Sequence, residues 1–230
     1  MIDFYEHERT QGGYSIFKTT GDPVIEVFYK MELDGGGTTF GQDYVPVLKD
    51  KYPGRQFERA YEWCSGPGFI GFSLLSHGIC KTLCLSDLYD PAITAAEITI
   101  DHGPNNCRDR VTAYLCKDLG LIPNHEQFDL VVANPPHFND LAGIPKNDYT
   151  GIRISKDINW QAHKNFFNNI KSHLTQDGVI LLQEHIHGAA ITDLADMIQS
   201  NGLQITDHYV SPNVEQTAMY YIEIKHVSAV

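Results

Sequence analysis

A glycine-rich stretch at residues 61–71, with the sequence YEWCSGPGFIG, constrains the fold of this chain more than any other feature. Gly66, Gly68 and Gly71 form the pattern G-x-G-x-x-G, after residues typical of a strand and before residues typical of a helix. Glycine permits positive φ and close backbone approach, and a helix start offers unbonded N–H groups and a partial positive charge. The stretch therefore predicts a strand–turn–helix unit that binds a nucleotide.

The segments that follow residue 59 alternate between strand-like and helix-like patterns. Strands are predicted over 60–64, 82–86, 111–116, 128–133, 179–183, 204–209 and 219–225, and helices over 68–76, 91–100, 160–173 and 191–200. A loop is predicted over 120–127 and a turn over 175–178. The alternation predicts an α/β fold with a doubly wound, mostly parallel, seven-stranded sheet of the Rossmann-like kind.

Residues 1–58 precede this pattern and are interpreted as an N-terminal extension of a domain at 59–230. A strand is predicted over 24–31 and a short helix over 44–51. The segment carries too little apolar material for a core of its own. We expect it to fold over the ligand-binding crevice as a substrate lid.

The composition limits the classes of partner. The 230 residues carry a formal net charge of −12, which repels nucleic-acid phosphates at long range and makes DNA an unlikely partner. The chain has no run of about 18 apolar residues and no signal sequence, and its five cysteines lack C-x-x-C spacing. We therefore expect a cytoplasmic protein with reduced thiols, no membrane span and no zinc site. Nothing in the sequence indicates an oligomeric state.

Polar residues stand at the ends of the first four predicted strands. Glu62 and Cys64 adjoin the glycine turn, and Asp87, Asp118 and Asn134 follow the next three strands. Ligands of such sheets bind at the carboxyl ends of the strands, so these residues are expected to line one crevice. Asp87 is placed to accept hydrogen bonds from ribose hydroxyls, and Asp118 from an exocyclic amine such as that of adenine.

Four motifs together, E-x-C-S-G-P-G-x-x-G, S-D-L, K-D-L and F-D-L-V-V-A-N-P-P-H, resemble the class I S-adenosylmethionine-dependent methyltransferases of the N-P-P-aromatic branch. That branch includes the release-factor glutamine, ribosomal-RNA guanine and adenine-N6 DNA methyltransferases, and the resemblance covers roughly residues 60–225. It implies N-methyltransferase activity with S-adenosylmethionine as cofactor. It also implies a set of cofactor-binding residues: Glu62, Cys64, Gly66, Gly68, Gly71, Asp87, Leu88, Asp118, Leu119 and Asn134.

The same resemblance implies that Asn134, Pro135 and His137 are catalytic. A conjugated nitrogen is a poor nucleophile, so the Asn134 side-chain oxygen and the Pro135 carbonyl are expected to accept its two N–H bonds and favour the tetrahedral form. His137 replaces the usual aromatic residue and is expected either to stack on a planar acceptor or to take the released proton. Cys64 stands where a glycine is usual.

The methyl acceptor is expected to be a planar amide or amine in a protein side chain, a peptide, a small metabolite or an RNA base. Two other functions fit part of the pattern. A nicotinamide-dependent oxidoreductase would use Asp87 for the ribose, but it leaves Asp118 and N-P-P-H unexplained. A non-catalytic cofactor-binding protein would keep the glycine turn without turnover.

Glu184, His185 and His187 form E-H-x-H after an apolar strand. Alternate residues of a strand share a face, so His185 and His187 are candidate metal ligands. No third ligand is evident and methyl transfer needs no metal, so we expect solvated or substrate-contacting histidines.

A second cluster lies in KDINWQAH, where Trp160 and His163 are one helical turn apart. Asp157 is expected to cap the helix that follows. The alternative is a substrate wall over the N-P-P-H loop.

Overall fold

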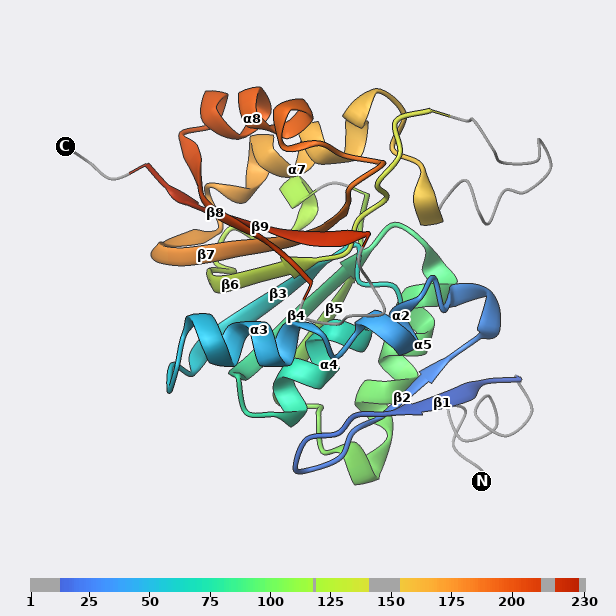
Figure 1. Ribbon diagram of the computed structural model, residues 1–230. Helices are drawn as coiled ribbons and strands as arrows, with labels where there is room; N and C mark the ends of the chain where they lie inside the picture. The colour runs from blue at the N-terminus through green and yellow to red at the C-terminus, as the bar shows by residue number, and fades with distance from the viewer. Residues whose placement is uncertain (1–12, 118, 141–153, 212–217, 228–230) are drawn as a thin grey trace. The chain divides into compact units, whose positions relative to one another are not determined.

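A computed structural model describes residues 13–117, 119–140, 154–211 and 218–227. The chain divides into two compact units, Met1–Cys116 and Lys117–Val230 (Figure 1). The division falls directly after strand β5 (Val111–Leu115), so each unit has its own strands and helices.

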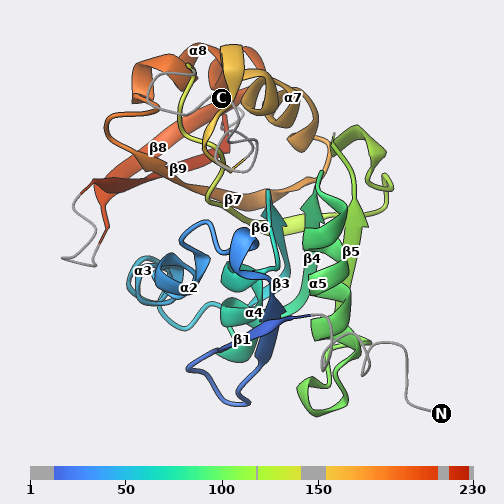
Figure 2. The same cartoon turned by 90° about the vertical axis from the view of Figure 1, so that its right-hand side faces the viewer.

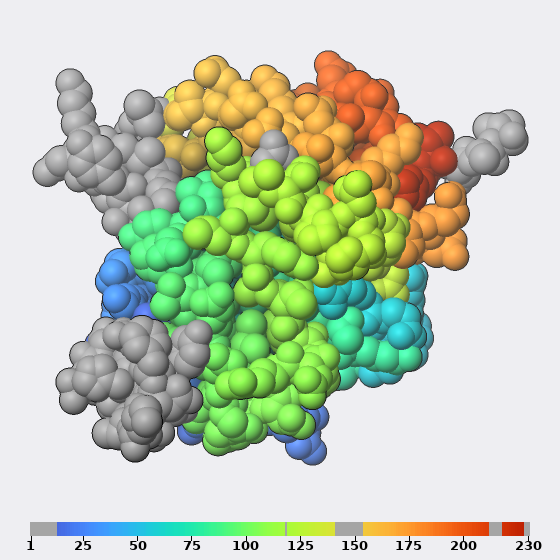
Figure 3. All heavy atoms as spheres, turned by 180° about the vertical axis from the view of Figure 1, so that it is seen from behind, coloured from blue at the N-terminus to red at the C-terminus, as the bar shows by residue number. Residues whose placement is uncertain are grey.

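The first unit is built on three parallel strands: β3 (Phe57–Trp63), β4 (Cys80–Asp87) and β5 (Val111–Leu115). Helix α4 (Phe69–Ser76) connects β3 to β4, and all of its residues are buried because the segment FIGFSLLS is apolar or small on every side. Helix α5 (Asp90–Asp101) connects β4 towards β5 and is amphipathic. It buries Ala95 and Ile98 and exposes Glu97, and its outer surface is green in Figure 3. These elements confirm the predicted strand–turn–helix unit.

The N-terminal part of this unit forms a hairpin and short helices. Strands β1 (Ser15–Lys18) and β2 (Glu26–Tyr29) are antiparallel, and η1 (Met31–Leu33), α2 (Gly37–Phe40) and α3 (Tyr44–Lys51) follow. The hairpin packs against α5, where the Phe28 N–H donates to Thr99 Oγ1 at 2.9 Å (Figure 2). The rings of Phe17 and Tyr29 also pack edge-on against Phe69, the first residue of α4. The predicted strand and helix are confirmed, whereas β1 was not expected.

The second unit contains β6 (Phe128–Ala133), β7 (Leu174–His185), β8 (Leu203–Val210) and β9 (Met219–His226). Strand β6 is parallel to β7, and β9 is antiparallel to both β7 and β8. Helices α7 (Gln161–Ile170) and α8 (Ile191–Ser200) bury apolar stripes that include Phe166, Phe167 and Ile198. Short 3-10 helices η2 (Gly103–Asn105), η3 (Leu119–Leu121) and η4 (Ile158–Trp160) complete the two units.

Two sequence predictions for the second unit were wrong in detail. The turn predicted over 175–178 lies within β7, because Leu174 already pairs with Phe128 and Val179 resumes the pairing at Leu130. The polar residues 175–178 form an irregularity within β7, whereas the prediction had β7 begin after them. The helix predicted over 160–173 begins at Gln161, because Trp160 has a left-handed backbone with φ 54°, and ends at Ile170.

The seven strands belong to one sheet with the order β5-β4-β3-β6-β7-β9-β8, while β1 and β2 form a sheet of their own. The predicted doubly wound, mostly parallel α/β fold is confirmed, and β9 near the C-terminus is antiparallel to its two neighbours. Within the described part of the chain, every helix is too short or too polar to cross a membrane.

Candidate functional site

The glycine turn joins β3 to α4 in the first unit. Gly66 and Gly68 have φ of 52° and 91°, which side-chain-bearing residues rarely adopt. A Cβ on Gly68 would lie 2.9 Å from Leu85 and Phe72, so this glycine is needed for packing. A Cβ on Gly66 would meet no atom within 4 Å, so the backbone there faces open space. A ligand can therefore approach the backbone at Gly66.

Glu62 stabilises the turn from within β3. Its carboxyl Oε2 accepts a hydrogen bond from the Gly71 N–H at 2.7 Å, and a Cβ on Gly71 would lie only 2.7 Å from the same oxygen. Burial raises the pKa of Glu62 to about 8, and the backbone N–H bonds from Gly71 and Ile70 offset this effect only in part. Glu62 is therefore largely protonated at neutral pH, and its role is to bind the backbone of the glycine turn.

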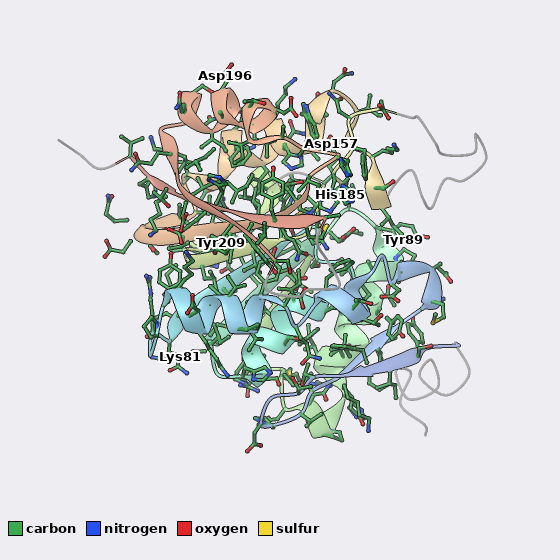
Figure 4. The ribbon with its side chains drawn as sticks, viewed as in Figure 1. Lys81, Tyr89, Asp157, His185, Asp196 and Tyr209 are labelled. Atoms are coloured by element: carbon green, nitrogen blue, oxygen red, sulfur yellow. The ribbon has the colours of Figure 1, made fainter. Side chains whose placement is uncertain are left out.

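Asp87, at the end of β4, is held against the glycine turn. Its Oδ2 accepts from the Gly66 N–H at 2.8 Å, and its Oδ1 accepts from the Tyr89 N–H at 2.9 Å. Tyr89 is labelled in Figure 4 at the start of α5. Asp87 is half-buried, and the following Leu88 is 57% exposed. A carboxylate oxygen accepts more than one hydrogen bond, so Asp87 can still bind ligand hydroxyls.

These residues of the first unit suit a cofactor that carries an adenosine. They combine an open backbone at Gly66, an acceptor at Asp87 and an exposed apolar side chain at Leu88. The predicted cofactor residue Asp118 lies outside the described residues, and its neighbour Leu119 is buried in η3.

In the second unit, the N-P-P-H segment follows β6. Ala133 pairs with Leu182, so residues 134–137 run beside the end of β7. Pro135 is buried, whereas Asn134 and His137 are half-buried. The Asn134 side chain makes no hydrogen bond to another described residue.

A chain of four acidic and imidazole side chains connects this segment to the interior of the unit. His137 Nδ1 lies 2.8 Å from Glu184 Oε2, and Glu184 Oε1 lies 3.0 Å from His163 Nε2. His163 Nδ1 in turn lies 2.7 Å from Asp157 Oδ2. The side chains of His163 and Glu184 are fully buried, and that of His137 is 13% exposed. We refer to Asp157, His163, Glu184 and His137 as the relay.

The relay alternates in charge. Burial alone would lower the pKa of His163, but its hydrogen bonds to Asp157 and Glu184 and their charges outweigh burial and raise this pKa to about 9. Burial would likewise raise the pKa of Glu184 and of Asp157, yet the histidine hydrogen bonds lower both. At neutral pH the buried part is therefore an imidazolium between two carboxylates.

Asp157 also fixes α7, as the sequence predicted. Its carboxylate accepts from the N–H groups of Ala162 at 2.8 Å and His163 at 3.0 Å. Phe138, next to His137, exchanges backbone hydrogen bonds with Ser155 and Asp157. Trp160 has φ 54°, an uncommon conformation for a bulky residue, and its ring packs edge-on against His163. Hydrogen bonds of Asp157 and Phe138 therefore connect the start of α7, the N-P-P-H segment and the relay to one another.

The interpretation of E-H-x-H needs correction. Strand β7 ends at His185, and His187 lies in the turn that follows, so the two histidines do not share a strand face. Within the described ranges, no group of three or more His, Cys, Asp or Glu side chains is arranged to hold a metal ion. Figure 4 labels Asp157, just before η4, and His185, the last residue of β7. The contact between His163 and Glu184 connects α7 to β7.

The contacts of Glu184 with His163 and His137 were not predicted, because residues 157–163 and 184–187 were interpreted as separate clusters. One signal pointed to it. Glu184 directly follows the run VILLQ, and the alternation of strand residues places it on the opposite face from His185. A carboxylate at the end of a buried apolar strand requires a cationic or donor partner.

No protein-family model and no curated protein matches the sequence. Solved structures are similar at low identity. A ribosomal protein L11 methylase from Lactobacillus delbrueckii subsp. bulgaricus superposes with a TM-score of 0.57, at 15% identity over 80% of this chain and 77% of its own. The glycopeptide N-methyltransferase MtfA complexed with S-adenosyl-L-methionine superposes with a TM-score of 0.59, at 13% identity over 81% of this chain and 94% of its own. TYW2 of M. jannaschii in complex with AdoMet superposes with a TM-score of 0.55, at 14% identity over 94% of this chain and 87% of its own. The chain therefore has the Rossmann-like fold of S-adenosylmethionine-dependent methyltransferases.

Proposed function

We propose that this protein is an S-adenosylmethionine-dependent methyltransferase. The observation that carries the proposal is the hydrogen bond of Asp87 to the Gly66 N–H, which brings the second strand end to the open glycine turn. Two solved structures of the same fold are described as complexes with this cofactor. The nicotinamide-dependent and non-catalytic alternatives gain no support from these likenesses.

The first unit is proposed to hold the cofactor. Asp87 would accept its ribose hydroxyls, the glycine turn would admit its polar chain, and Leu88 would cover its base. Glu62 and Cys64 would shape the turn. When bound, this cofactor supplies a methyl group attached to a positively charged sulfur.

The second unit is proposed to present the acceptor, a planar amide or amine nitrogen. The side-chain oxygen of the half-buried Asn134 and the Pro135 carbonyl would accept its two N–H bonds. This favours the tetrahedral nitrogen, whose lone pair can attack the methyl group. His137 would contact the same acceptor. A protein side chain, a small molecule or a structured RNA fits this proposal, and the net charge of −12 disfavours DNA.

Ligand-induced thermal stabilisation tests the cofactor. S-adenosylhomocysteine at about 100 times its Kd would add about 2.7 kcal/mol to the folded state, and NAD and NADP would add nothing. Asp87→Ala should abolish the shift, whereas Asp101→Ala, at the end of α5, should keep it. A shift with NAD and none with S-adenosylhomocysteine would overturn the proposal in favour of an oxidoreductase.

Transfer of tritiated methyl groups into a cell extract, fractionated into RNA, protein and small molecules, tests the reaction and identifies the acceptor class. Asn134→Ala should abolish transfer, because the acceptor contact is removed, and leave S-adenosylhomocysteine binding within about threefold of the original, because the glycine turn and Asp87 remain. Transfer near the original rate would show that Asn134 does not hold the acceptor.

A further inference from the structure

One imidazole nitrogen of the relay has no hydrogen-bond partner among the described residues. Within the described residues, His137 Nδ1 contacts Glu184 and His137 Nε2 makes no hydrogen bond. Glu184 is fully buried and is held by two histidines, so its oxygens act as acceptors. His137 Nδ1 must then carry a proton, because an unprotonated nitrogen would place its lone pair against that of the carboxylate.

The tautomer of His137 follows from this contact. With Nδ1–H donated to Glu184, the neutral ring carries its lone pair on Nε2. This is the state of a general base whose other nitrogen is oriented by a carboxylate. A histidine used only for stacking would need no buried carboxylate behind it.

His163 and Asp157 explain why Glu184 can stay ionised in the interior. An isolated buried carboxylate is costly, and His163 Nε2 at 3.0 Å supplies the compensating positive charge. Asp157, at 2.7 Å from the other nitrogen of His163, holds that charge in place. The three buried groups together keep a net charge of −1, which faces His137.

We propose that His137 is the general base of the reaction and that Glu184, His163 and Asp157 are positioning residues that hold its Nε2 as a proton acceptor. This inference rests on the proposed function. The acceptor nitrogen forms the new N–C bond, the C–S bond of the donor breaks, and its electron pair leaves on sulfur. The methylated nitrogen then loses its proton to His137 Nε2, and the Glu184 carboxylate stabilises the imidazolium until water takes the proton.

The surroundings of His137 agree with this role. His185 lies with its ring centroid 6.4 Å from that of His137, and burial lowers the pKa of His185. His185 is therefore neutral at pH 7 and does not add a competing charge. On β9, the hydroxyl of Tyr220 donates to the Ala189 carbonyl, and burial raises its pKa, so it also stays neutral. Among the described residues, the ionised group in hydrogen-bond contact with the His137 ring is Glu184 of the relay.

Nuclear magnetic resonance of the ¹⁵N-labelled imidazoles tests the positioning without any turnover. At neutral pH the His137 ring, assigned by its loss in His137→Phe, should show a protonated Nδ1 and an unprotonated Nε2. In Glu184→Gln the amide can donate as well as accept, so the signal should become a mixture of tautomers. A protonated Nε2 in the original protein would overturn the proposal, whether or not the protein methylates.

The rate of tritium transfer to the fractionated extract tests catalysis. His137→Phe keeps a planar ring and removes the base, so transfer should fall by about 10²-fold or more while S-adenosylhomocysteine binding persists. His208→Phe, a matched change on the exposed side of β8, should leave the rate unchanged. Transfer by His137→Phe within threefold of the original would identify a stacking residue and overturn the proposal.

A comparison of transfer with cofactor binding separates positioning from a merely structural effect. Glu184→Gln removes the carboxylate that accepts from His137 Nδ1, so the rate of transfer should fall while S-adenosylhomocysteine binding persists. An equal loss of transfer and of S-adenosylhomocysteine binding would contradict the proposal. If the original protein transfers no methyl group, the proposed function fails instead, and the tautomer measurement still decides the positioning.

Discussion

Cys64 has the backbone of a glycine. Its φ of 52° lies in the left-handed region, which explains why glycine is usual at this point of the resembling motif. The left-handed conformation costs a residue with a Cβ about 1–2 kcal/mol, and glycine loses about 0.5–1 kcal/mol in unfolded-state entropy. Cys64→Gly should therefore raise the free energy of unfolding by about 0.5–1 kcal/mol, measured by urea denaturation.

The matched control is Cys116→Gly, because Cys116 has no positive φ. It should lower the free energy of unfolding by roughly the entropy cost alone, about 0.5–1 kcal/mol. Equal destabilisation by both substitutions would show that Cys64 is not strained.

Glu62 makes stability depend on pH. Its pKa is about 8 in the folded protein and near 4.5 when unfolded, so between these values the unfolded chain binds fewer protons than the folded one. The free energy of unfolding should fall as pH rises from about 4.5 to about 8 and then level off. Glu62→Gln removes this dependence.

Urea denaturation at pH 5 and pH 8 checks the effect. The variant should gain stability relative to the original protein at the higher pH, by a few kcal/mol. Glu58→Gln, at the exposed start of the same strand, is the control. A difference between Glu62→Gln and the original that is the same at both pH values would contradict the buried, protonated state.

At the scale of the elements, the turn after β7 supports the N-P-P-H segment. A Cβ on Gly188 would lie 2.5 Å from the His137 carbonyl oxygen and 2.9 Å from the His137 Cβ. Backbone atoms cannot rotate away, so Gly188→Ala should displace His137 from Glu184. We expect methyl transfer to fall at least about tenfold and stability to fall by about 1–3 kcal/mol, with cofactor binding in the first unit retained.

The control for this prediction is Gly103→Ala, where an added Cβ meets no atom within 4 Å. It should change neither transfer nor stability noticeably. A Gly188→Ala variant as active as the control would show that the close approach to His137 is unimportant. Transfer rates and urea denaturation of the two variants decide the question.

The elements also show where sequence patterns suffice. Segments with a clear period, such as FDLVVA for β6 and residues 191–200 for α8, were predicted with their observed bounds. The errors occurred where tertiary contacts override local composition. TQDG reads as a turn, yet Leu174 before it pairs with Phe128 and makes it part of β7. The left-handed Trp160 likewise depends on contacts around His163 that no local pattern records.

At the scale of the whole molecule, the candidate site was only partly predictable. Glu62 contacts Gly71 within the glycine motif, so the motif alone indicates this part of the turn. Asp87 contacts Gly66 from the end of the next strand, where its motif placed it. The relay joins residues from the N-P-P-H segment, α7 and β7 that are up to 47 positions apart. These side-chain contacts depend on strand register and burial, which cannot be read from a single sequence.

Net charge is the last property that belongs to the whole molecule. The formal charge of −12 makes the folded state repel itself, and salt screens this repulsion. Exposed ion pairs such as Lys81–Glu58 and Arg108–Asp101 weaken with salt, but each contributes only about 0–1 kcal/mol. The melting temperature should therefore rise between about 10 and 500 mM sodium chloride. Scanning calorimetry at pH 7 checks this, and a falling melting temperature would show that attractive pairs outweigh the overall repulsion.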